Sequence, residues 1–502
     1  MRNAILAVAL LALLVSGCQR RGEPDPADSP AAKARPTHRY NVLLVTLDTT
    51  RVDYLSCYDP QKAGLTPNLD AIAADGIRFE RAMAQAPTTP MSHASILTGL
   101  NPYEHGLRVL TAASGYRLDE KIPRLNSVLK QHGWTTAAFL SSFTVSEYYG
   151  FDFGFDVFDS GVETDPAGIV ELLPDGRKRW NQRRHQRRSD ETTDRVLEWL
   201  SQAPAEPFFL WIHYWDPHDR MVLAPPEILR RFVKPGMKRE TPPWKEAIYR
   251  AEIHYVDMQF ARVIDALRQR GLYDNTIIVI VADHGQGLGQ HGWWAHRLLY
   301  QEDLHVPLIM RIPGWPTGRV VPELVRTIDI YPTVMEALGL PVGSRVSGRS
   351  LRGLIEGRSE PPRWAYAEAI NKFDEMGHVV QRRPKADLLY AAIERDWKFL
   401  FRYSYPDESE LYHLADDPHE LVNLYQQEPA QVRRLKALLD ACKSYVTRPF
   451  GPTTGNLAAL EHLQALGYVG GGEEDEEEEP PPATQPTSAP ASAPAPVDDP
   501  NN

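Results

Sequence analysis

Long apolar runs that end in polar residues recur along the chain. The segment NVLLVTLD at residues 41–48 is a continuous apolar run that ends in an acid. Similar runs are TTAAFL at 135–140, PFFLWIHYW at 207–215 and NTIIVIVADHG at 275–285. Continuous apolar runs of this length are typical of parallel strands that are buried on both faces. We therefore expect the polar residues that follow these runs to lie at the carboxyl edge of one sheet.

Helical patterns alternate with the predicted strands. Apolar residues spaced by three and four positions, which predict one stripe on a long helix, are Ile253, Val256, Phe260, Val263 and Leu267. Strands that alternate with helices indicate an α/β domain with a mostly parallel sheet. After about residue 360, DWKFLFRY and ELYHL predict short antiparallel strands, and PAQVRRLKALLDAC predicts a helix across them. We therefore expect a smaller C-terminal α+β subdomain.

The segment PTTPMSHASILTG, residues 87–99, predicts the start of a helix. Pro90 disfavours helical backbone at Thr89, Ser92 is a good N-cap, and Gly99 is a suitable stop. A helix is thus expected to begin directly after Ser92, with Thr89 just ahead of its N-terminus. Free backbone N–H groups and the helix dipole favour an anion at such a place. Taken alone, the segment is also explained by a capped helix with a polar entry loop.

The composition is that of an ordinary globular protein, with 502 residues of which 42% are apolar and 24% charged. The net charge of −11 is concentrated at one end of the chain. Seven acids at residues 473–479, together with Asp498 and Asp499, account for nine negative charges and leave −2 for the rest. A nearly neutral body gives no electrostatic basis for nucleic-acid binding, so we expect no nucleic-acid partner.

The two ends of the chain predict export and flexible appendages. Residues 1–18 hold one basic residue and an apolar run that is too short to span a membrane, which is typical of a signal peptide. The closing LVSGC is similar to the bacterial lipobox, in which the cysteine, here Cys18, is lipidated. We expect a membrane-anchored lipoprotein on the periplasmic side of the envelope or at the cell surface; a cleaved secretion signal is the alternative. Residues 19–37 predict a Pro-rich tether, and 471–502 a disordered acidic and Pro/Ala-rich tail.

Two further cysteines, Cys57 and Cys442, remain after Cys18. An oxidising compartment permits them to pair. Two distant cysteines in a large domain are more often separate buried thiols, and the sequence leaves the choice open.

Acids and histidines follow three of the predicted strands. They are Asp48, Asp216, His218, Asp283 and His284. Carboxylate oxygens and imidazole nitrogens are ligands for divalent cations, so their convergence at one sheet edge predicts a metal site. A solvated strand end explains each Asp–His pair equally well when the pair is taken singly.

Eight motifs stand in an order that is similar to one known family. The opening motif consists of NVLLVTLDTTRVDYLSCY followed by TPNLDAIAADGIRFERAMA, and SHASILTGLNPYEHG is the second motif. FFLWIHYWDPHD, VADHGQGLGQHG, LYQEDLHVPLIMRIPG, VRTIDIYPTVMEALGLP, GRSL and ELYHLADDPHELVNL follow in turn. From about residue 40 to 468 the chain resembles the sulfatase family of the alkaline phosphatase superfamily. The resemblance implies an alkaline-phosphatase-like α/β catalytic domain at 38–358 and a C-terminal subdomain at 359–470.

The resemblance also implies roles for individual residues. Asp48, Asp283 and His284 match metal-binding positions, for calcium, manganese or zinc, and Thr89 stands where the family carries the Cys or Ser that becomes formylglycine. The implied catalytic residues are Thr89, His93, His218 and His296, with Ser92 and Arg51 at the substrate and Asp216, His218 and His296 around a possible second metal. His93 replaces the signature arginine. Arg51 is equally explained by pairing with a surface carboxylate, and Trp293 and Trp294 either form an apolar substrate wall or pack in the core.

Three departures from the family pattern concern the chemistry. Thr89 carries a secondary hydroxyl, so no formylglycine is expected there. Thr49 stands where typical sulfatases have another metal-binding Asp, and AAFLSSFTVS after Thr136 replaces the GKWHLG segment with its lysine and histidine. The related nucleotide pyrophosphatases and phosphodiesterases use a plain threonine on a metal ion, which keeps phosphate esters open as substrates.

We therefore expect a metal-dependent hydrolase of sulfuric esters, or of related phosphate esters, that forms a covalent intermediate on Thr89. The expected substrate is a small-molecule or glycan ester. Ser92 and the helix N-terminus are expected to hold its anionic oxygens, and His218 with His296 to stabilise the leaving group. The alternatives are a phosphodiesterase or phosphonate monoester hydrolase or transferase, and a catalytically inactive binding protein with the sulfatase fold.

Overall fold

The computed structural model describes residues 38–447 except 111–116, 163–169, 173–177, 181–184, 219–221 and 375–377. The expected signal peptide at 1–18 with Cys18, the tether at 19–37 and the tail at 471–502 lie outside the described residues. In the part of the chain that the structure describes, no helix is both long and apolar enough to cross a membrane.

An eight-stranded sheet forms the centre of the larger domain, in the order β10-β2-β9-β8-β1-β7-β3-β4. Its strands are β1 (Asn41–Leu47), β2 (Ile77–Met83), β3 (Thr135–Phe139), β4 (Val157–Asp159), β7 (Phe208–Tyr214), β8 (Thr276–Ala282), β9 (His305–Arg311) and β10 (Arg319–Arg326). Only β9 runs against the others, since it is antiparallel to both β2 and β8. A separate two-stranded sheet pairs β5 (Val170–Leu172) with β6 (Lys178–Trp180).

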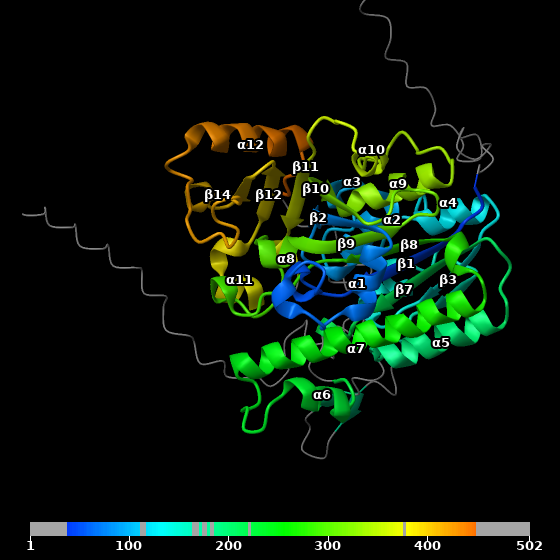
Figure 1. Ribbon diagram of the computed structural model, residues 1–502. Coiled ribbons are helices and arrows are strands. Elements are labelled where there is room, and N and C mark those ends of the chain that lie inside the picture. Colours follow the sequence, from blue (N-terminus) through cyan, green and yellow to red (C-terminus); the bar gives the residue numbers. More distant parts are fainter. Residues whose placement is uncertain are drawn as a thin grey trace, which may run out of the picture.

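Helices cover both faces of the large sheet (Figure 1). One face carries α1 (Pro67–Ala74), α5 (Ser189–Ser201) and α7 (Pro242–Gln269), with α6 (Pro226–Phe232) packed outside α7. The other face carries α2 (Thr89–Thr98), α3 (Pro102–His105), α4 (Leu125–Gln131), α9 (Ile330–Ala337) and α10 (Arg352–Ile355). The short helix α8 (Gln301–Leu304) leads into β9. Because both faces are covered, β1, β7 and β8 are buried along their full length, as their continuous apolar runs predict.

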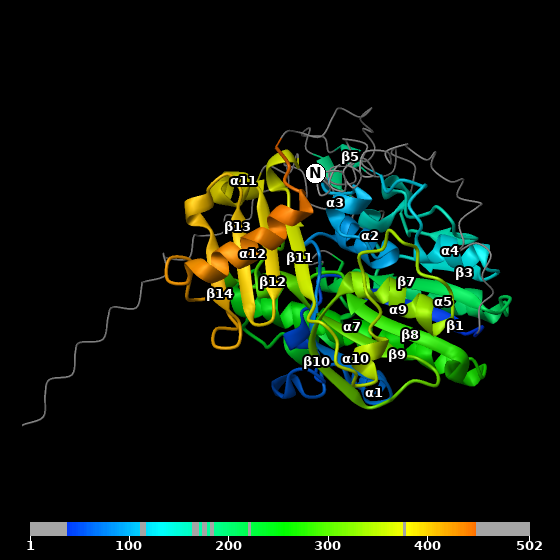
Figure 2. The same ribbon diagram turned by 90° about the horizontal axis from the view of Figure 1, so that it is seen from above.

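A four-stranded antiparallel sheet makes up the smaller C-terminal part. It consists of β11 (Trp364–Ala369), β12 (Leu389–Glu394), β13 (Trp397–Arg402) and β14 (Glu410–His413), with α11 (His378–Arg382) before β12. Helix α12 (Pro429–Cys442) lies across this sheet (Figure 2) and buries Leu435 and Leu439 against it. The expected α/β fold with a smaller α+β subdomain is therefore confirmed. Cys57 and Cys442 are both free thiols in this structure.

The register of the central strands aligns the carboxyl ends that carry the acids. Leu47 on β1 is paired with Tyr214 on β7 and with Ala282 on β8. The next residues on β1 and β8, Asp48 and Asp283, therefore stand at the same level on neighbouring strands.

Candidate active site

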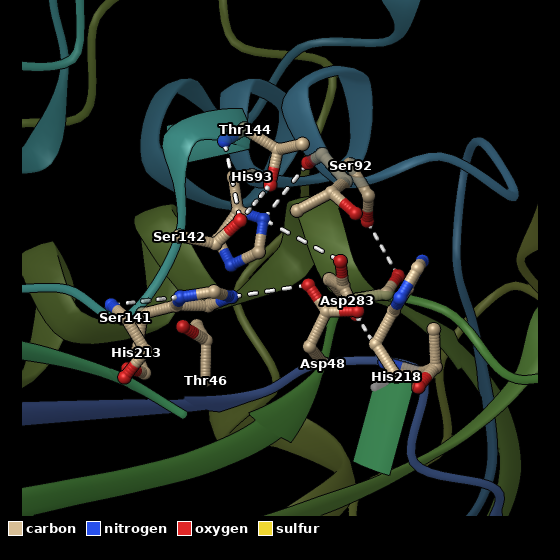
Figure 3. Close-up of polar contacts among 12 residues, drawn as sticks. Thr46, Asp48, Ser92, His93, Ser141, Ser142, Thr144, His213, His218 and Asp283 are labelled. Atoms are coloured by element: carbon tan, nitrogen blue, oxygen red, sulfur yellow. Dashed lines mark hydrogen bonds and ion pairs between the residues drawn. The ribbon is translucent and has the colours of Figure 1, made fainter. Parts of the chain in front are cut away.

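Two carboxylates and one imidazole form a compact group at this sheet edge. Ligand atoms of Asp48, Asp283 and His284 all lie within 4.8 Å of one another, and the three side chains are fully buried. Asp48 and Asp283 face each other in Figure 3. Asp48 follows β1, while Asp283 and His284 follow β8, so the parallel register brings the three groups together.

The unmatched oxygens of these carboxylates fit a divalent cation. Asp48 Oδ1 and Asp283 Oδ2 are buried without a hydrogen-bond partner. Burial raises the pKa of both carboxyls well above the usual range, and the neighbouring Asp48 charge raises the pKa of Asp283 further. Two buried carboxylates with free lone pairs are costly unless a cation or protons neutralise them. An oxygen and imidazole donor set of this kind suits manganese or zinc.

The other carboxylate oxygens are fixed by donors that orient the pair. Asp283 Oδ1 accepts hydrogen bonds from the backbone N–H groups of His284 at 2.8 Å and Thr49 at 3.1 Å. Asp48 Oδ2 lies 3.1 Å from His213 Nε2, and Figure 3 shows His213 between Asp48 and Ser141. The backbone N–H of Ser141 faces His213 Nδ1 at 3.5 Å, so the proton of His213 is placed on Nε2, toward Asp48. Such outer contacts aim the remaining oxygens into the site.

Thr89 reaches the same group from the start of α2. Its Oγ1 lies 3.3 Å from His284 Nε2, and a hydrogen bond from Thr89 also lowers the pKa of Asp48 against the larger effect of burial. His284 Nδ1 donates to the carbonyl oxygen of Gly285 at 2.9 Å, which leaves the Nε2 lone pair directed toward Thr89. Burial lowers the pKa of His284 to about 3, so its imidazole is neutral. The Thr89 hydroxyl therefore contacts two of the groups that the sequence predicts at a metal, His284 and Asp48.

The start of α2 differs from the sequence prediction. The helix begins at Thr89, with Thr88 as its N-cap, and ends at Gly99 in the left-handed conformation. Ser92 is not the N-cap: its N–H donates to the Thr88 carbonyl at 3.0 Å, and its Oγ donates to the Asp283 carbonyl at 2.5 Å. The prediction was wrong because Pro90 falls in the first helical turn, where its missing N–H costs nothing. Thr89 consequently lies inside the helix N-terminus rather than ahead of it.

His93 lies behind the nucleophile position, one turn along α2. Its Nδ1 donates to the Thr89 carbonyl at 2.8 Å and lies 3.6 Å from Asp283 Oδ2. The side chain is fully buried, and burial followed by the nearby His213 lowers its pKa well below the usual range. A neutral imidazole thus occupies the place of the signature arginine, and its contacts are with protein groups under the site.

His218 and His296 form a second pair at the mouth of the site. Their Nε2 atoms lie 3.3 Å apart, and His296 Nδ1 donates to the carbonyl of Pro87 at 2.8 Å. The Nε2 of neutral His296 is therefore the acceptor, and His218 Nε2 carries the shared proton. Burial and the neighbouring His284 and His218 lower the pKa of His296 well below the usual range.

Asp216 is not assembled with these two histidines into a compact ligand group among the residues the structure describes. Its Oδ1 accepts from the N–H of Ser189 at 3.0 Å and from the Ser189 hydroxyl at 2.6 Å. Burial raises the pKa of Asp216 to about 7. Asp216 thus joins the end of β7 to the start of α5, and the second metal stays a prediction.

Arg51 is bound by protein groups. Its Nε and Nη2 donate to the Asp53 carboxylate at 2.9 and 2.8 Å, and Nη1 donates to the Gln286 carbonyl at 3.2 Å. Arg51 thus pairs with a surface carboxylate, which is the predicted alternative to substrate binding. Arg51 links the loop after β1 to the loop after β8.

Two site residues were missed by the sequence reasoning. His213 is an ionisable side chain within the otherwise apolar run FFLWIHYW of a buried strand. A buried histidine of this kind could have been recognised as a candidate for the site. Arg297 follows His296, is buried, and pairs with Asp374 at 2.7 Å. Its charge contributes to the lowered pKa of His284 and His296. Nothing in the sequence distinguishes Arg297 from a surface arginine.

Comparison with known proteins identifies the family. The model of the Sulfatase family matches residues 40–340, and the model described as N-sulphoglucosamine sulphohydrolase, C-terminal, matches residues 289–444. The chain belongs to the sulfatase family. It is accordingly a hydrolase that acts on ester bonds, and sulfatase-fold enzymes are generally metal-dependent.

Curated relatives of this sulfatase-family protein match most of its length. It is 25% identical over 488 residues to N-acetylglucosamine-6-O-sulfatase of Bacteroides thetaiotaomicron, a match that covers 78% of this chain and 83% of the relative. It is 27% identical over 471 residues to a sulfatase of Formosa agariphila, with 80% of this chain and 89% of the relative covered. The arylsulfatase of Clostridium perfringens is 25% identical over 484 residues, with 83% and 96% covered.

Solved structures share the fold. A structure described as a complex with its substrate D-glucosamine-2-N,6-O-disulfate superposes with a TM-score of 0.62 at 22% identity, covering 81% of this chain and 98% of the other. The phosphonate monoester hydrolase of Agrobacterium radiobacter gives a TM-score of 0.61 at 23% identity, covering 81% and 95%. The sulfatase fold thus accommodates neighbours named for different esters.

We expect Asp283→Asn to remove most of the stabilisation against unfolding that a bound metal gives the protein. The amide keeps an oxygen for the N–H groups of Thr49 and His284 but removes one of two coupled buried charges. The metal-free variant should therefore be at least as stable as the metal-free wild type. Metal at 100 times its Kd should stabilise the wild type by about 2.7 kcal/mol and the variant far less. Thermal unfolding with and without manganese or zinc measures this; an equal gain in both proteins would contradict the assigned ligands.

Proposed function

We propose that the protein hydrolyses sulfate esters through a covalent intermediate on Thr89. The observation that carries the proposal is the Thr89 hydroxyl, 3.3 Å from His284 Nε2 at the first position of α2. It contacts Asp48, and the unmatched oxygens of Asp48 and Asp283 suit a cation. A hydroxyl nucleophile beside a cation site is an arrangement that supports covalent ester hydrolysis.

Asp48, Asp283, His284 and Thr89 would hold the metal. A bound divalent cation lowers the pKa of a coordinated hydroxyl and offsets negative charge on the reacting ester. The protein keeps the ligand atoms aimed inward through His213 on Asp48 and through the backbone N–H of Thr49 on Asp283. This chain supplies Thr89 as the nucleophile without oxidation to formylglycine.

Thr89 attacks sulfur from the helix N-terminus. The positive end of the α2 dipole lies at this residue and favours the negative charge that develops on the ester oxygens. The hydroxyl proton has an acceptor in the Asp48 carboxylate, which contacts Thr89. The Ser92 hydroxyl donates to Asp283 and so braces the site from α2.

His218 protonates the leaving alcohol. The proton on His218 Nε2 is shared with His296, and His296 is held by the Pro87 carbonyl, two residues before the nucleophile. This contact ties the proton donor to the position of Thr89. After the alcohol departs, the same histidines accept a proton from the water that cleaves the covalent ester, by microscopic reversibility.

The substrate class follows from the relatives. Those named above include an N-acetylglucosamine-6-O-sulfatase and an arylsulfatase, which favours a sulfated sugar or aryl sulfate here. A phosphorus ester is the second candidate. The observation that favours it is the neutral, buried His93 in place of the arginine of typical sulfatases, since it removes a fixed cation from the anion site.

A substrate panel tests the proposal. The full chain is stripped of metal, resupplied in turn with calcium, manganese and zinc, and assayed on 4-nitrophenyl sulfate, 4-nitrophenyl phosphate, a phosphate diester and a phosphonate monoester. We expect the highest kcat/KM on the sulfate ester. Higher kcat/KM on a phosphorus ester would replace the sulfatase assignment by the second candidate, and tight metal binding without turnover of any ester would favour a binding protein.

A further inference from the structure

The indole ring of Trp215 is stacked on the imidazole ring of His218. The ring centroids lie 3.9 Å apart, with an angle of 22° between the two planes. Trp215 is the residue directly after β7, and the backbone N–H of His218 donates to the Trp215 carbonyl at 2.9 Å. The short helical turn Asp216–His218 thus folds the chain back so that the two rings lie face to face.

Two contacts hold the His218 ring in different directions. The Trp215 ring covers one face of the imidazole, while the Nε2 atom at its edge lies 3.3 Å from His296 Nε2. The face contact opposes tilting of the ring, and the edge contact opposes rotation within its plane. Trp215 is only 2% exposed and belongs to the main hydrophobic core, so it is a rigid support. A proton donor requires this kind of fixed orientation toward the leaving oxygen.

Core packing alone does not explain a tryptophan at this position. The Nε1–H of Trp215 is buried and has no hydrogen-bond partner among the residues that the structure describes. An unpaired buried N–H costs free energy, and a purely apolar ring would fill the core without that cost. Trp211, on β7, differs because its Nε1 donates to Thr46 Oγ1 at 3.0 Å. The unpaired donor at Trp215 therefore points to a role for the large flat ring, and the group stacked on that ring is His218.

We infer that Trp215 is a positioning residue that holds the His218 ring for proton delivery to the leaving alcohol. In that step the bond from sulfur to the alcohol oxygen breaks, the electron pair stays on this oxygen, and the proton of His218 neutralises it. Trp215 acts through His218 and not on the ester, so its effect is specific to leaving groups that need the proton. The inference rests on the proposed function, because it assigns a support to the proton donor of that reaction.

The test compares two aryl esters, phenyl sulfate and 4-nitrophenyl sulfate. Phenolate is the more basic leaving group and depends on protonation, whereas 4-nitrophenolate departs readily without a proton. In Trp215→Leu we expect kcat/KM to fall roughly 30-fold for phenyl sulfate and to stay within about threefold for 4-nitrophenyl sulfate. Trp215→Phe keeps an aromatic face and should lose no more than about fivefold on phenyl sulfate, with stability at least equal to that of the wild type because the unpaired N–H is gone. Equal loss on both esters in Trp215→Leu would overturn the inference.

Two further variants control for a general loss of packing. Trp199→Leu removes a tryptophan from the same hydrophobic core, but this ring packs against Phe208 and Phe139 and should change the two rates in equal proportion. In a His218→Gln background no proton donor remains to be held, so Trp215→Leu should no longer change the ratio of the two rates. A change of that ratio that persists in this background would contradict a role through His218.

A measurement without turnover separates the inference from the proposed function. Ring protons of a histidine that lie over an indole face resonate upfield, and the His218 signal in isotope-labelled protein is identified by its loss in His218→Gln. We expect this signal to move downfield in Trp215→Leu and to stay in place in Trp199→Leu. If it moves but the wild type hydrolyses neither ester, the stacking is supported and the proposed function fails alone. If it does not move, the inference fails even when wild-type turnover is normal.

Discussion

Replacing Thr89 with alanine is expected to lower kcat by roughly 10⁴-fold or more, as loss of a nucleophile does in other covalent hydrolases, with little change in KM. The only side-chain partners of the Thr89 hydroxyl that the structure gives are the groups of the site, His284 and Asp48. Alanine is a better helix former than threonine, so α2 should persist. Steady-state rates on the preferred ester, together with circular dichroism, measure both expectations.

Thr88→Ala is the matched control for this change. Thr88 precedes Thr89, is equally buried, and makes no capping hydrogen bond through its side chain. We expect it to retain most of the activity. Thr89→Ser keeps a hydroxyl at the same atom and should also remain active. A Thr89→Ala protein with wild-type turnover would eliminate Thr89 as the nucleophile and leave water as the attacking group.

The strands could be predicted because burial on both faces is visible in the sequence. The continuous apolar runs within residues 41–48 and 275–285 favour buried strands, and β1 and β8 fall inside them. The apolar stripe from Ile253 to Leu267 lies within α7 for the same reason. Since carboxyl ends of parallel strands share one edge, the predicted meeting of Asp48 with Asp283 and His284 followed directly from the strand predictions.

Contacts that depend on register or side-chain direction could not be predicted. The sequence places Ser92 at a helix start but does not show that its hydroxyl reaches the Asp283 carbonyl. His213 is in contact with Asp48 because β7 and β1 pair with Thr46 opposite His213, which is a property of the sheet.

A buried ion pair holds the C-terminal part of the chain against the catalytic loop. Lys398 on β13 lies 2.7 Å from Glu420, and both side chains are fully buried. The other carboxylate oxygen of Glu420 accepts a hydrogen bond from the backbone N–H of Gln301 at 2.5 Å. The backbone carbonyl oxygen of Glu420 lies 3.2 Å from His291 Nε2. The segment from His291 to Gln301 contains His296. The family motif around Glu420 is therefore explained by support of the loop that carries the proton donor pair.

Lys398→Met is expected to destabilise the protein by about 3–5 kcal/mol, because it leaves the Glu420 carboxylate buried without its counter-charge. Denaturant unfolding measures the loss. Activity should fall together with stability, since the loop of His296 loses its support. The double variant Lys398→Met/Glu420→Gln should recover much of the loss, because no buried charge then remains.

The destabilisation caused by Lys398→Met is also expected to depend on pH. Burial raises the pKa of Glu420, which Lys398 counteracts, so removal of Lys398 raises that pKa further. A carboxyl whose pKa is higher in the folded state stabilises the fold while protonated, and this stability is lost as the pH rises through the folded-state pKa. The destabilisation of Lys398→Met relative to wild type should therefore be smaller at about pH 5 than at about pH 8.

Lys385→Met is the matched control for both Lys398 predictions. Lys385 forms an ion pair with Glu408 at the same separation of 2.7 Å, but both side chains are half-exposed. Removing this surface pair should leave stability unchanged at either pH. Equal destabilisation by both lysine variants would show that the buried pair does not hold the loop.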